Sequence, residues 1–361
     1  MLFKMSKIQK KSEQVNKRNK IAVDIMSGDN PPHILIDGAL QAASESDLEI
    51  ILVGNRNLIK QELMKYKNLD LSKISICHSD EIIEMDETPA KACKLKPKAS
   101  VMVAADLVAK ELADAYISPG NSGATMTASL LKLKRIKGIK RPAIAATMPT
   151  LTGYTVLIDA GANVDTKPEH LVQFGYMGSI YMRKMFKTFM SHPPRVGLLT
   201  IGEEELKGNE LTLRASDLLK QSSLNFIGNV EGKDINTGKC DVVVCDGFVG
   251  NIVLKVTEGV AAVVVKLLKR SIKKSLFRRI AALLLLPVFA ELKLKLDAKE
   301  YGGALLLGTN GITVICHGNS DEIATKNAIK FADFCVKNNL NQEIENELSK
   351  LTNLTEDGED E

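Results

Sequence analysis

Short runs of β-branched and other apolar residues recur from residue 20 onward, and they restrict the fold more than any other feature. The runs are Ile21–Met26, Glu49–Val53, Ile74–Cys77, Ala115–Ser118, Ala143–Met148, Val156–Asp159, Val196–Ile201, Phe226–Asn229, Val242–Cys245 and Ile312–Cys316. Between them lie stretches with helical spacing: His33–Ala43, Ser100–Leu112, Gly123–Leu133, Pro168–Lys184 and Asn209–Leu219. Strands that alternate with helices in this way form a largely parallel sheet covered on both faces. The sequence therefore predicts a three-layer α/β/α fold.

Composition supports one large domain, which we place at residues 21–340. The chain has 361 residues and is 45% hydrophobic, which is typical of a globular protein. Its net charge of +4 is too small for the whole surface to bind nucleic acid, so any such role would need a local basic patch. Six scattered cysteines without a Cys-x-x-Cys pair predict neither a disulfide framework nor a zinc site. This pattern fits a reduced, cytoplasmic protein with no bound metal.

The two ends differ from this domain. The first twenty residues hold seven Lys or Arg without a following apolar segment, so residues 1–20 are predicted to be a disordered basic extension rather than a secretory signal. A transit peptide is also basic and poor in acids, and stays an alternative. Residues 341–361 hold eight acidic residues against Lys350 alone, which predicts a solvated, mobile tail.

Residues 266–296 are expected to form an amphipathic helical hairpin. Seven cations precede the apolar run Ile280–Ala290, in which Pro287 should break a helix. The run is shorter than the roughly 20 residues that a membrane span needs, so we expect nothing in the chain to cross a bilayer. A basic, apolar element of this kind suits an anionic membrane surface. The alternatives are a dimer contact, a cover for the core, or a contact with an acidic partner. The cations are Lys266, Lys269, Arg270, Lys273, Lys274, Arg278 and Arg279.

Glycine, asparagine, serine and aspartate gather in the loops that follow the predicted strands. Examples are Gly120-Asn121-Ser122-Gly123 and Asp246-Gly247-Phe248-Val249-Gly250-Asn251. Glycine lets the backbone approach a ligand, and a helix N-terminus offers free amides to an anion. These loops predict a phosphate or oxyanion site at a shared edge of the sheet, although turns and helix caps use the same residues. The sequence lacks Gly-x-Gly-x-x-Gly, a P-loop and Gly-x-Ser-x-Gly, which argues against nucleotide binding and serine hydrolysis.

Several of these loops are similar to those of the phosphate acyltransferases of bacterial phospholipid synthesis, the PlsX family. The similarity runs from about Ile21 to Ala332. It includes Lys167-Pro168-Glu169-His170-Leu171, Ile201 to Thr212, Asp241 to Asn251 and His317-Gly318. Ser27 and Pro119 depart from the usual pattern of the family.

The resemblance implies a fold similar to isocitrate and isopropylmalate dehydrogenases and to phosphotransacetylases. It implies transfer of a fatty acyl group from acyl carrier protein to inorganic phosphate, giving acyl phosphate for glycerol-3-phosphate acylation. It further implies a homodimer without cofactor that works beside a membrane-bound acyltransferase. Arg278, Arg279, Leu284 and Leu285 would then contact the membrane or the acidic carrier.

Such a reaction needs a site that holds phosphate beside a thioester and stabilises an oxyanion. Lys207 is the first candidate for the positive charge and Asn251 for a neutral donor; the alternatives are a solvated turn lysine and an N-cap. Asn121, Ser122, Gly123 and Gly28 are candidates for binding phosphate. His170 is a secondary candidate for substrate binding or proton transfer, its alternative being a packed histidine.

Other chemistry-bearing residues are expected to be structural. Cys245 lies in an apolar run and is predicted to be a buried thiol, while Asp24, Asp159 and Asp246 are predicted to cap helices. Rival functions are a short-chain phosphotransacetylase, a decarboxylating dehydrogenase, and a non-catalytic adaptor for a membrane or carrier protein.

Overall fold

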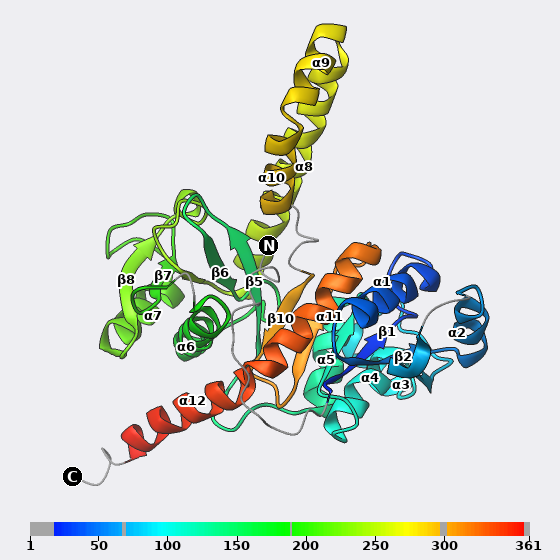
Figure 1. Ribbon diagram of the computed structural model, residues 1–361. Helices are drawn as coiled ribbons and strands as arrows, with labels where there is room; N and C mark the ends of the chain where they lie inside the picture. Colours follow the sequence, from blue (N-terminus) through cyan, green and yellow to red (C-terminus); the bar gives the residue numbers. More distant parts are fainter. Residues whose placement is uncertain (1–17, 67–69, 188–189, 297–301, 357–361) are drawn as a thin grey trace.

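The computed structural model describes residues 18–66, 70–187, 190–296 and 302–356 of the chain (Figure 1). Eleven strands within these ranges form one sheet in the order β3-β2-β1-β4-β11-β10-β5-β6-β9-β7-β8. The strands are β1 (Lys20–Asp24), β2 (Glu49–Gly54), β3 (Ile74–His78), β4 (Ala115–Ser118), β5 (Ala143–Pro149), β6 (Tyr154–Ile158), β7 (Arg195–Leu199), β8 (Asn225–Val230), β9 (Val242–Val244), β10 (Ala304–Leu307) and β11 (Ile312–Ile315). All ten predicted strands are confirmed, and β10 is an additional one.

Helices connect most of the strands, as the predicted alternation requires. They are α1 (Pro32–Glu45), α2 (Arg56–Leu63), α3 (Pro89–Leu95), α4 (Ser100–Ala109), α5 (Ser122–Lys132), α6 (Pro168–Met185), α7 (Glu210–Gln221), α8 (Gly247–Lys273), α9 (Leu276–Leu284), α10 (Leu286–Leu296), α11 (Glu322–Lys337) and α12 (Leu340–Glu356). Two single turns of 3-10 helix, Leu71–Lys73 and Gly232–Asp234, complete the described elements.

The sheet is largely parallel, but its two halves run in opposite directions. Strands β3, β2, β1, β4 and β11 are parallel, and β6, β9, β7 and β8 are parallel. Between the halves lie three antiparallel pairings: β11 with β10, β10 with β5, and β5 with β6. The expectation that all strand-end loops share one edge is therefore wrong, because the carboxyl ends of the two halves point in opposite directions along the sheet.

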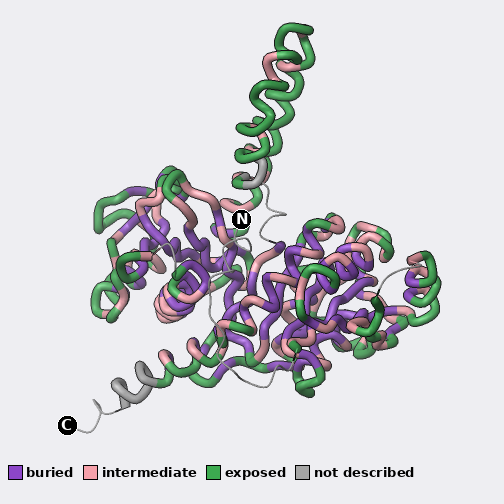
Figure 2. The backbone as a smooth tube through the Cα atoms, in the orientation of Figure 1, coloured by how far each residue is buried: buried purple, intermediate pink, exposed green. Residues whose placement is uncertain are grey.

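Successive side chains of each strand point to opposite faces of the sheet and pack in the hydrophobic core on that face. Val156 and Ile158 of β6 pack on the face covered by α1, α6, α7 and α11, whereas Leu157 packs on the other face. The other face is covered by α3, α4 and α5 over the first half of the sheet. Over the second half it is covered by the first turns of α8. The predicted α/β/α layering is confirmed, and Figure 2 shows the buried backbone concentrated along these layers.

The predicted hairpin is longer than expected and reverses at a different place. It stands out from the body as α8, α9 and α10, which we call the protrusion, Gly247–Leu296 (Figure 1). The chain turns back at Lys274 and Ser275, where the Arg279 guanidinium donates to the Lys273 carbonyl at 2.9 Å. The returning arm is interrupted at Leu285, between α9 and α10, and Pro287 is the second residue of α10. The predicted bounds 266–296 are too short, because α8 begins at Gly247 and runs for about five turns before Lys266.

Helix α8 also contradicts the expectation that nothing is long enough to cross a bilayer. By length and composition it qualifies, with a mean hydropathy of 1.8 over its most apolar 18 residues, only 6% of which are buried. The sequence of α8 contains no unbroken apolar run of this length, because Lys255 and Glu258 interrupt it. Its first turns nevertheless contact β5 and β6.

The acidic C-terminal segment is not a solvated tail over most of its length. Residues 340–356 form α12, in which Leu340, Ile344 and Leu348 are buried against the core beside α6. Their spacing of four residues places them on one helical face. Glu343 and Glu347 border this face and pair with Lys184 and Arg183 of α6. Residues 357–361 lie outside the described part, as do residues 1–17 of the predicted basic extension.

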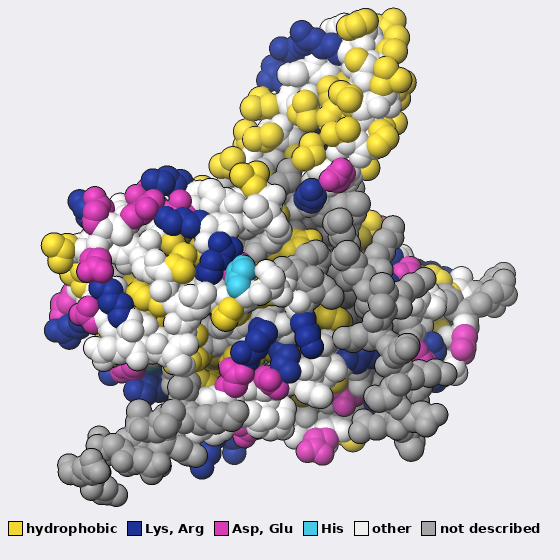
Figure 3. All heavy atoms as spheres, turned by 60° about the vertical axis from the view of Figure 1, so that its left-hand side comes forward, with side chains coloured by type: hydrophobic (Ala, Val, Ile, Leu, Met, Phe, Trp, Pro, Cys, Tyr) yellow, Lys and Arg dark blue, Asp and Glu magenta, His cyan; other side chains and the backbone are white. Residues whose placement is uncertain are grey.

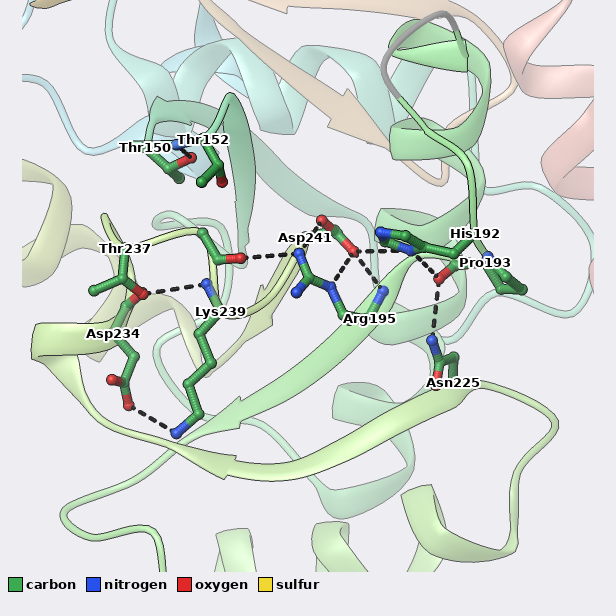
Figure 4. A network of polar contacts seen from close by, with 11 residues as sticks. Thr150, Thr152, His192, Pro193, Arg195, Asn225, Asp234, Thr237, Lys239 and Asp241 are labelled. Atoms are coloured by element: carbon green, nitrogen blue, oxygen red, sulfur yellow. Dashed lines mark hydrogen bonds and ion pairs between the residues drawn. The ribbon is translucent and has the colours of Figure 1, made fainter.

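An ion pair joins the amino ends of β7 and β9 (Figure 4). The Arg195 guanidinium donates to both carboxylate oxygens of Asp241, at 3.0 and 2.9 Å, and the Arg195 amide donates to the same carboxylate at 2.8 Å. The Arg195 Nη2 that donates to Asp241 also donates to the Gly238 carbonyl at 2.9 Å. Because this cluster lies at the end of the strands opposite to the loops that carry Asn251 and Lys207, it stabilises the second half of the sheet without entering the candidate site.

Candidate functional site

Gly28 lies where three loops of the first half of the sheet converge. It has φ of +98°, and a Cβ at this position would lie 2.9 Å from the Gly318 carbonyl oxygen and 3.1 Å from that of Pro119. The neighbouring Asp29 amide donates to the Gly318 carbonyl at 2.8 Å. Glycine is therefore required for the loops after β1, β4 and β11 to approach one another.

Asp24 holds two of these loops together and does not cap a helix, contrary to the prediction. One carboxylate oxygen accepts a hydrogen bond from the Ser118 hydroxyl at 2.8 Å. The other accepts from the amides of Met26 and Ser27 at 3.2 and 3.3 Å. The carboxylate is fully buried.

Asn121 caps α5 with its side chain. Helix capping, the alternative to phosphate binding for these loops, is therefore the role that its side chain has in the structure. Its Oδ1 accepts from the Ala124 amide at 3.1 Å, and its Nδ2 donates to the Met85 carbonyl at 2.9 Å. Ser122 follows as the first residue of α5 and is exposed. A Cβ on Gly123 would lie 2.7 Å from Pro89, so this glycine allows α3 and α5 to pack closely.

Asp159 organises the loop after β6. One carboxylate oxygen accepts from the amides of Ile144, Gly161 and Ala162 at 2.9, 3.1 and 2.9 Å. The other accepts from the amide and side chain of Asn163 at 2.7 and 2.8 Å. The predicted role as a helix cap is wrong: five donors converge on this buried carboxylate and fix residues 160–163.

Asn251 faces this loop from the second turn of α8. The side chain is exposed, and a Cβ on Gly161 would lie 3.4 Å from the Asn251 Cβ and 3.5 Å from its Oδ1. The helix is instead capped by Asp246, which accepts from the Val249 amide at 2.9 Å, as predicted for Asp246. The N-cap alternative for Asn251 is therefore wrong, and its amide is directed at the surface beside Gly161.

His170 lies at the start of α6, just beyond the same loop. It is buried, and its Nδ1 accepts from the Lys167 amide at 3.1 Å. Burial lowers its pKa, as do the charges of Arg141 and Lys140, while the neighbouring Glu169 opposes them. A neutral imidazole with this bond carries its proton on Nε2.

Lys207 lies in the exposed loop between β7 and α7 and forms no ion pair with the described residues. Hydrogen bonds from Asn229 fix this loop, and Asn229 is not among the functional residues predicted from the sequence. Asn229, at the end of β8, is 7% exposed and donates to the carbonyls of Glu204 at 2.8 Å and Lys207 at 3.4 Å. Its Oδ1 is buried without a hydrogen-bond partner. The one signal in the sequence that could have found Asn229 is its position at the end of a predicted strand.

A polar cluster on α8 connects the two halves of the sheet. Lys255 lies 2.9 Å from the Glu258 carboxylate and 3.0 Å from Nε2 of His317, which follows β11. The contacts with His317 and then Lys255 lower the pKa of Glu258, against the effect of partial burial. The protrusion is thereby attached at its base to the Gly318 loop as well as to β6.

Cys245 is a buried thiol, as predicted. It is 3% exposed, its Sγ lies 3.6 Å from the Asp159 carbonyl, and burial raises its pKa well above the usual value for cysteine. A nucleophilic thiolate is disfavoured at such a position.

The predicted site residues thus fall into two groups. Gly28 and residues 121–123 belong to the first half of the sheet, and His170, Lys207 and Asn251 to the second. Each group offers backbone amides and neutral donors in loops, and Lys207 adds a cation. This donor set suits an anion or a developing oxyanion better than a metal ion, which prefers several carboxylates.

Sequence comparison relates the chain to one family over nearly its whole length. Residues 19–343 match the family described as fatty acid synthesis protein. A relative from Geotalea uraniireducens, named phosphate acyltransferase, is 49% identical over 92% of this chain and 94% of its own length. One of the same name from Pelotomaculum thermopropionicum is 48% identical over 92% and 96%.

Solved structures confirm the fold that the resemblance implied. A phosphotransacetylase from Streptococcus pyogenes has a TM-score of 0.58 at 18% identity, covering 89% of this chain and 94% of its own. A 4-hydroxythreonine-4-phosphate dehydrogenase from Klebsiella pneumoniae has a TM-score of 0.51 at 12% identity, covering 90% and 99%. At these identities the likeness concerns the fold alone.

Proposed function

Because the chain belongs to the phosphate acyltransferase family, we propose that it transfers a fatty acyl group from acyl carrier protein to inorganic phosphate. The observation that carries this proposal is the high identity to phosphate acyltransferases along more than nine-tenths of the chain. The product, an acyl phosphate, would serve glycerol-3-phosphate acylation in phospholipid synthesis.

The reaction balances without an added oxidant or cofactor. A phosphate oxygen attacks the thioester carbonyl and forms a tetrahedral intermediate with a negative oxygen. As this intermediate collapses, the new C–O bond is retained, the C–S bond breaks and the carrier sulfur leaves. The carrier thiol takes up the proton that phosphate gives up. The enzyme has to hold two reactants in line and stabilise negative charge.

We assign the charge to Lys207 and a neutral donor for the oxyanion to Asn251. The Lys207 ammonium is exposed, and Asn229 holds its loop through two carbonyls. The Asn251 side chain lies beside Gly161, whose lack of a side chain lets the asparagine lie close to the loop 160–163. His170, with its pKa lowered by burial, would orient substrate as a neutral donor through Nε2. Ser122, the Gly123 amide and the loop at Gly28 would supply further donors to phosphate.

The test is to incubate the purified protein with palmitoyl-acyl carrier protein, with and without phosphate. We expect phosphate-dependent release of the carrier thiol and trapping of the product as a hydroxamate. Carrier binding without thiol release at any phosphate concentration would support an adaptor instead. A requirement for coenzyme A and short acyl chains would indicate a phosphotransacetylase, and a requirement for NAD and a divalent metal a dehydrogenase.

We further propose that the protrusion attaches a cytoplasmic homodimer peripherally to the membrane. Figure 3 shows hydrophobic side chains along the protrusion, with Lys and Arg gathered toward its outer end. Phe277 is 78% exposed and Leu284 81% exposed, next to the cations Arg278 and Arg279. An exposed apolar surface of this extent beside cations suits the boundary of an anionic bilayer. Leu285, 48% exposed, would contribute to the same contact.

A further inference from the structure

We propose that the segment Lys132–Arg141, from the last residue of α5 almost to the start of β5, is the docking surface for the acidic acyl carrier protein. This inference rests on the proposed function, in which the carrier protein delivers the acyl group. It names the surface of this chain that the carrier contacts, and it separates that surface from the protrusion.

The segment is strongly and almost exclusively positive. Six of its ten residues are Lys or Arg, and the chain contains no Asp or Glu between Asp114 and Asp159. Two of the cations are near acids from elsewhere: Lys132 is 3.0 Å from Asp106, and Lys140 is 3.7 Å from Glu169. The exposed residues Lys134, Lys137 and Arg141 form no ion pair in the described part of the chain.

The segment is rigid, so it presents these charges in a fixed arrangement. Leu133, Ile136 and Ile139 are buried at every third position, and the intervening cations face outward. The Ile136 amide donates to the Gly308 carbonyl at 3.1 Å, and the Asn310 amide donates to the Lys134 carbonyl at 3.1 Å. Residues 134–139 and Leu130 line an open hollow of about 470 Å³. A preorganised surface loses little conformational entropy when a partner binds.

The carboxyl end of the segment is joined to the loop that faces Asn251. The Pro142 carbonyl accepts from the Asn163 side chain at 2.7 Å, and the Ile144 amide donates to Asp159 at 2.9 Å. A carrier bound to the segment would therefore hold its thioester near the loop 160–163. Apart from Lys255, which pairs with Glu258, the cations of the protrusion begin at Lys266, about 22 Å along α8 from Asn251 at 1.5 Å per residue.

The chemistry of the segment favours a protein partner over a lipid surface. Its apolar side chains point into the core, so it has nothing to insert below lipid headgroups, whereas the protrusion exposes such residues. Complementary charge at an interface accelerates association and selects the partner, and its effect weakens as salt is added.

The test compares Lys134→Glu/Lys137→Glu with two variants of equal charge change. Lys60→Glu/Lys187→Glu alters exposed lysines remote from the segment, and Lys269→Glu/Lys273→Glu alters the protrusion. Each is assayed with acyl carrier protein and with an acyl-pantetheine thioester that lacks the protein. For the first variant we expect a rise in KM for the carrier on the order of tenfold, which shrinks with salt, and unchanged kinetics with the small thioester. The control pair should change neither.

An unchanged KM for the carrier, or an equal loss with the small thioester, would overturn the assignment. A larger rise in KM for the carrier in Lys269→Glu/Lys273→Glu would also overturn it. So would a Lys134→Glu/Lys137→Glu variant that loses binding to anionic vesicles while its KM for the carrier stays unchanged. If the wild-type protein transfers no acyl group, the proposed function fails. The surface is then judged by direct binding of fluorescently labelled carrier, which the Lys134→Glu/Lys137→Glu variant should weaken to the same degree.

Discussion

Replacing Asp159 by asparagine should destabilise the protein and impair the site together. Asparagine keeps one acceptor oxygen for the amides of Ile144, Gly161 and Ala162 but presents an NH₂ group to the two donors of Asn163, which lie 2.7 and 2.8 Å away. Hydrogen bonds to charged groups are worth about 1.5–3 kcal/mol each, and part of that is offset because a buried charge is removed. We therefore expect the free energy of unfolding to fall by about 3 kcal/mol.

Urea unfolding followed by circular dichroism measures this, because the chain contains no tryptophan to report by fluorescence. With a denaturant slope of about 3 kcal/mol per molar, the midpoint should drop by about 1 M. Turnover should fall at least roughly tenfold, since the loop 160–163 borders Asn251. Asp246→Asn is the matched control: that carboxylate makes a single cap bond to Val249, and asparagine caps equally well. If Asp159→Asn matches this control in both midpoint and turnover, the carboxylate does not organise the loop.

Four further outcomes follow from the contacts described. Lys207→Ala should lower turnover by orders of magnitude with an unchanged urea midpoint; near wild-type activity would remove Lys207 from the mechanism. Leu283→Ser/Leu284→Ser should reduce flotation with anionic vesicles about a hundredfold, since each side chain contributes about 1–2 kcal/mol on burial; unchanged flotation would exclude this surface. Arg195→Ala should cost about 2 kcal/mol of stability with little change in KM, and a selective loss of turnover would contradict its placement outside the site. Because the pKa of Glu258 is lowered, its contribution to stability is present above about pH 4.5 and lost as the pH falls further. Glu258→Gln should therefore lower the urea midpoint at pH 7 but not at a pH well below 4.5. An equal decrease at both pH values would show that the ionised Glu258 carboxylate does not stabilise the fold.

Most of the fold could be predicted from the sequence because strand and helix periods are local. The strand β10 was missed because Leu305, Leu306 and Leu307 carry no alternation and no β-branched residue, and its role as an antiparallel strand between two halves depends on distant partners. The buried stripe of α12 was present in the sequence at four-residue spacing, but the excess of acidic residues obscured it.

The site could be predicted only as a set of residue types. The loops after strands correctly marked Gly28 and Asn121 as lying at strand ends, whereas Asn251 lies in the second turn of the helix that follows β9. Their division into two groups could not be predicted, because it follows from the reversal of direction across β10 and β5. Likewise, nothing in the local sequence distinguishes Asp159, which binds five donors, from Asp246, which caps a helix.

The central claim is that phosphate itself attacks the acyl carbon of a carrier-bound thioester. The most direct measurement is ³¹P NMR of the protein with palmitoyl-acyl carrier protein and phosphate labelled with ¹⁸O at every oxygen. We predict a new acyl phosphate resonance that retains the whole label, together with an equal amount of free carrier thiol. An intact carrier with unchanged phosphate, or free fatty acid released without a new phosphorus signal, would contradict the account.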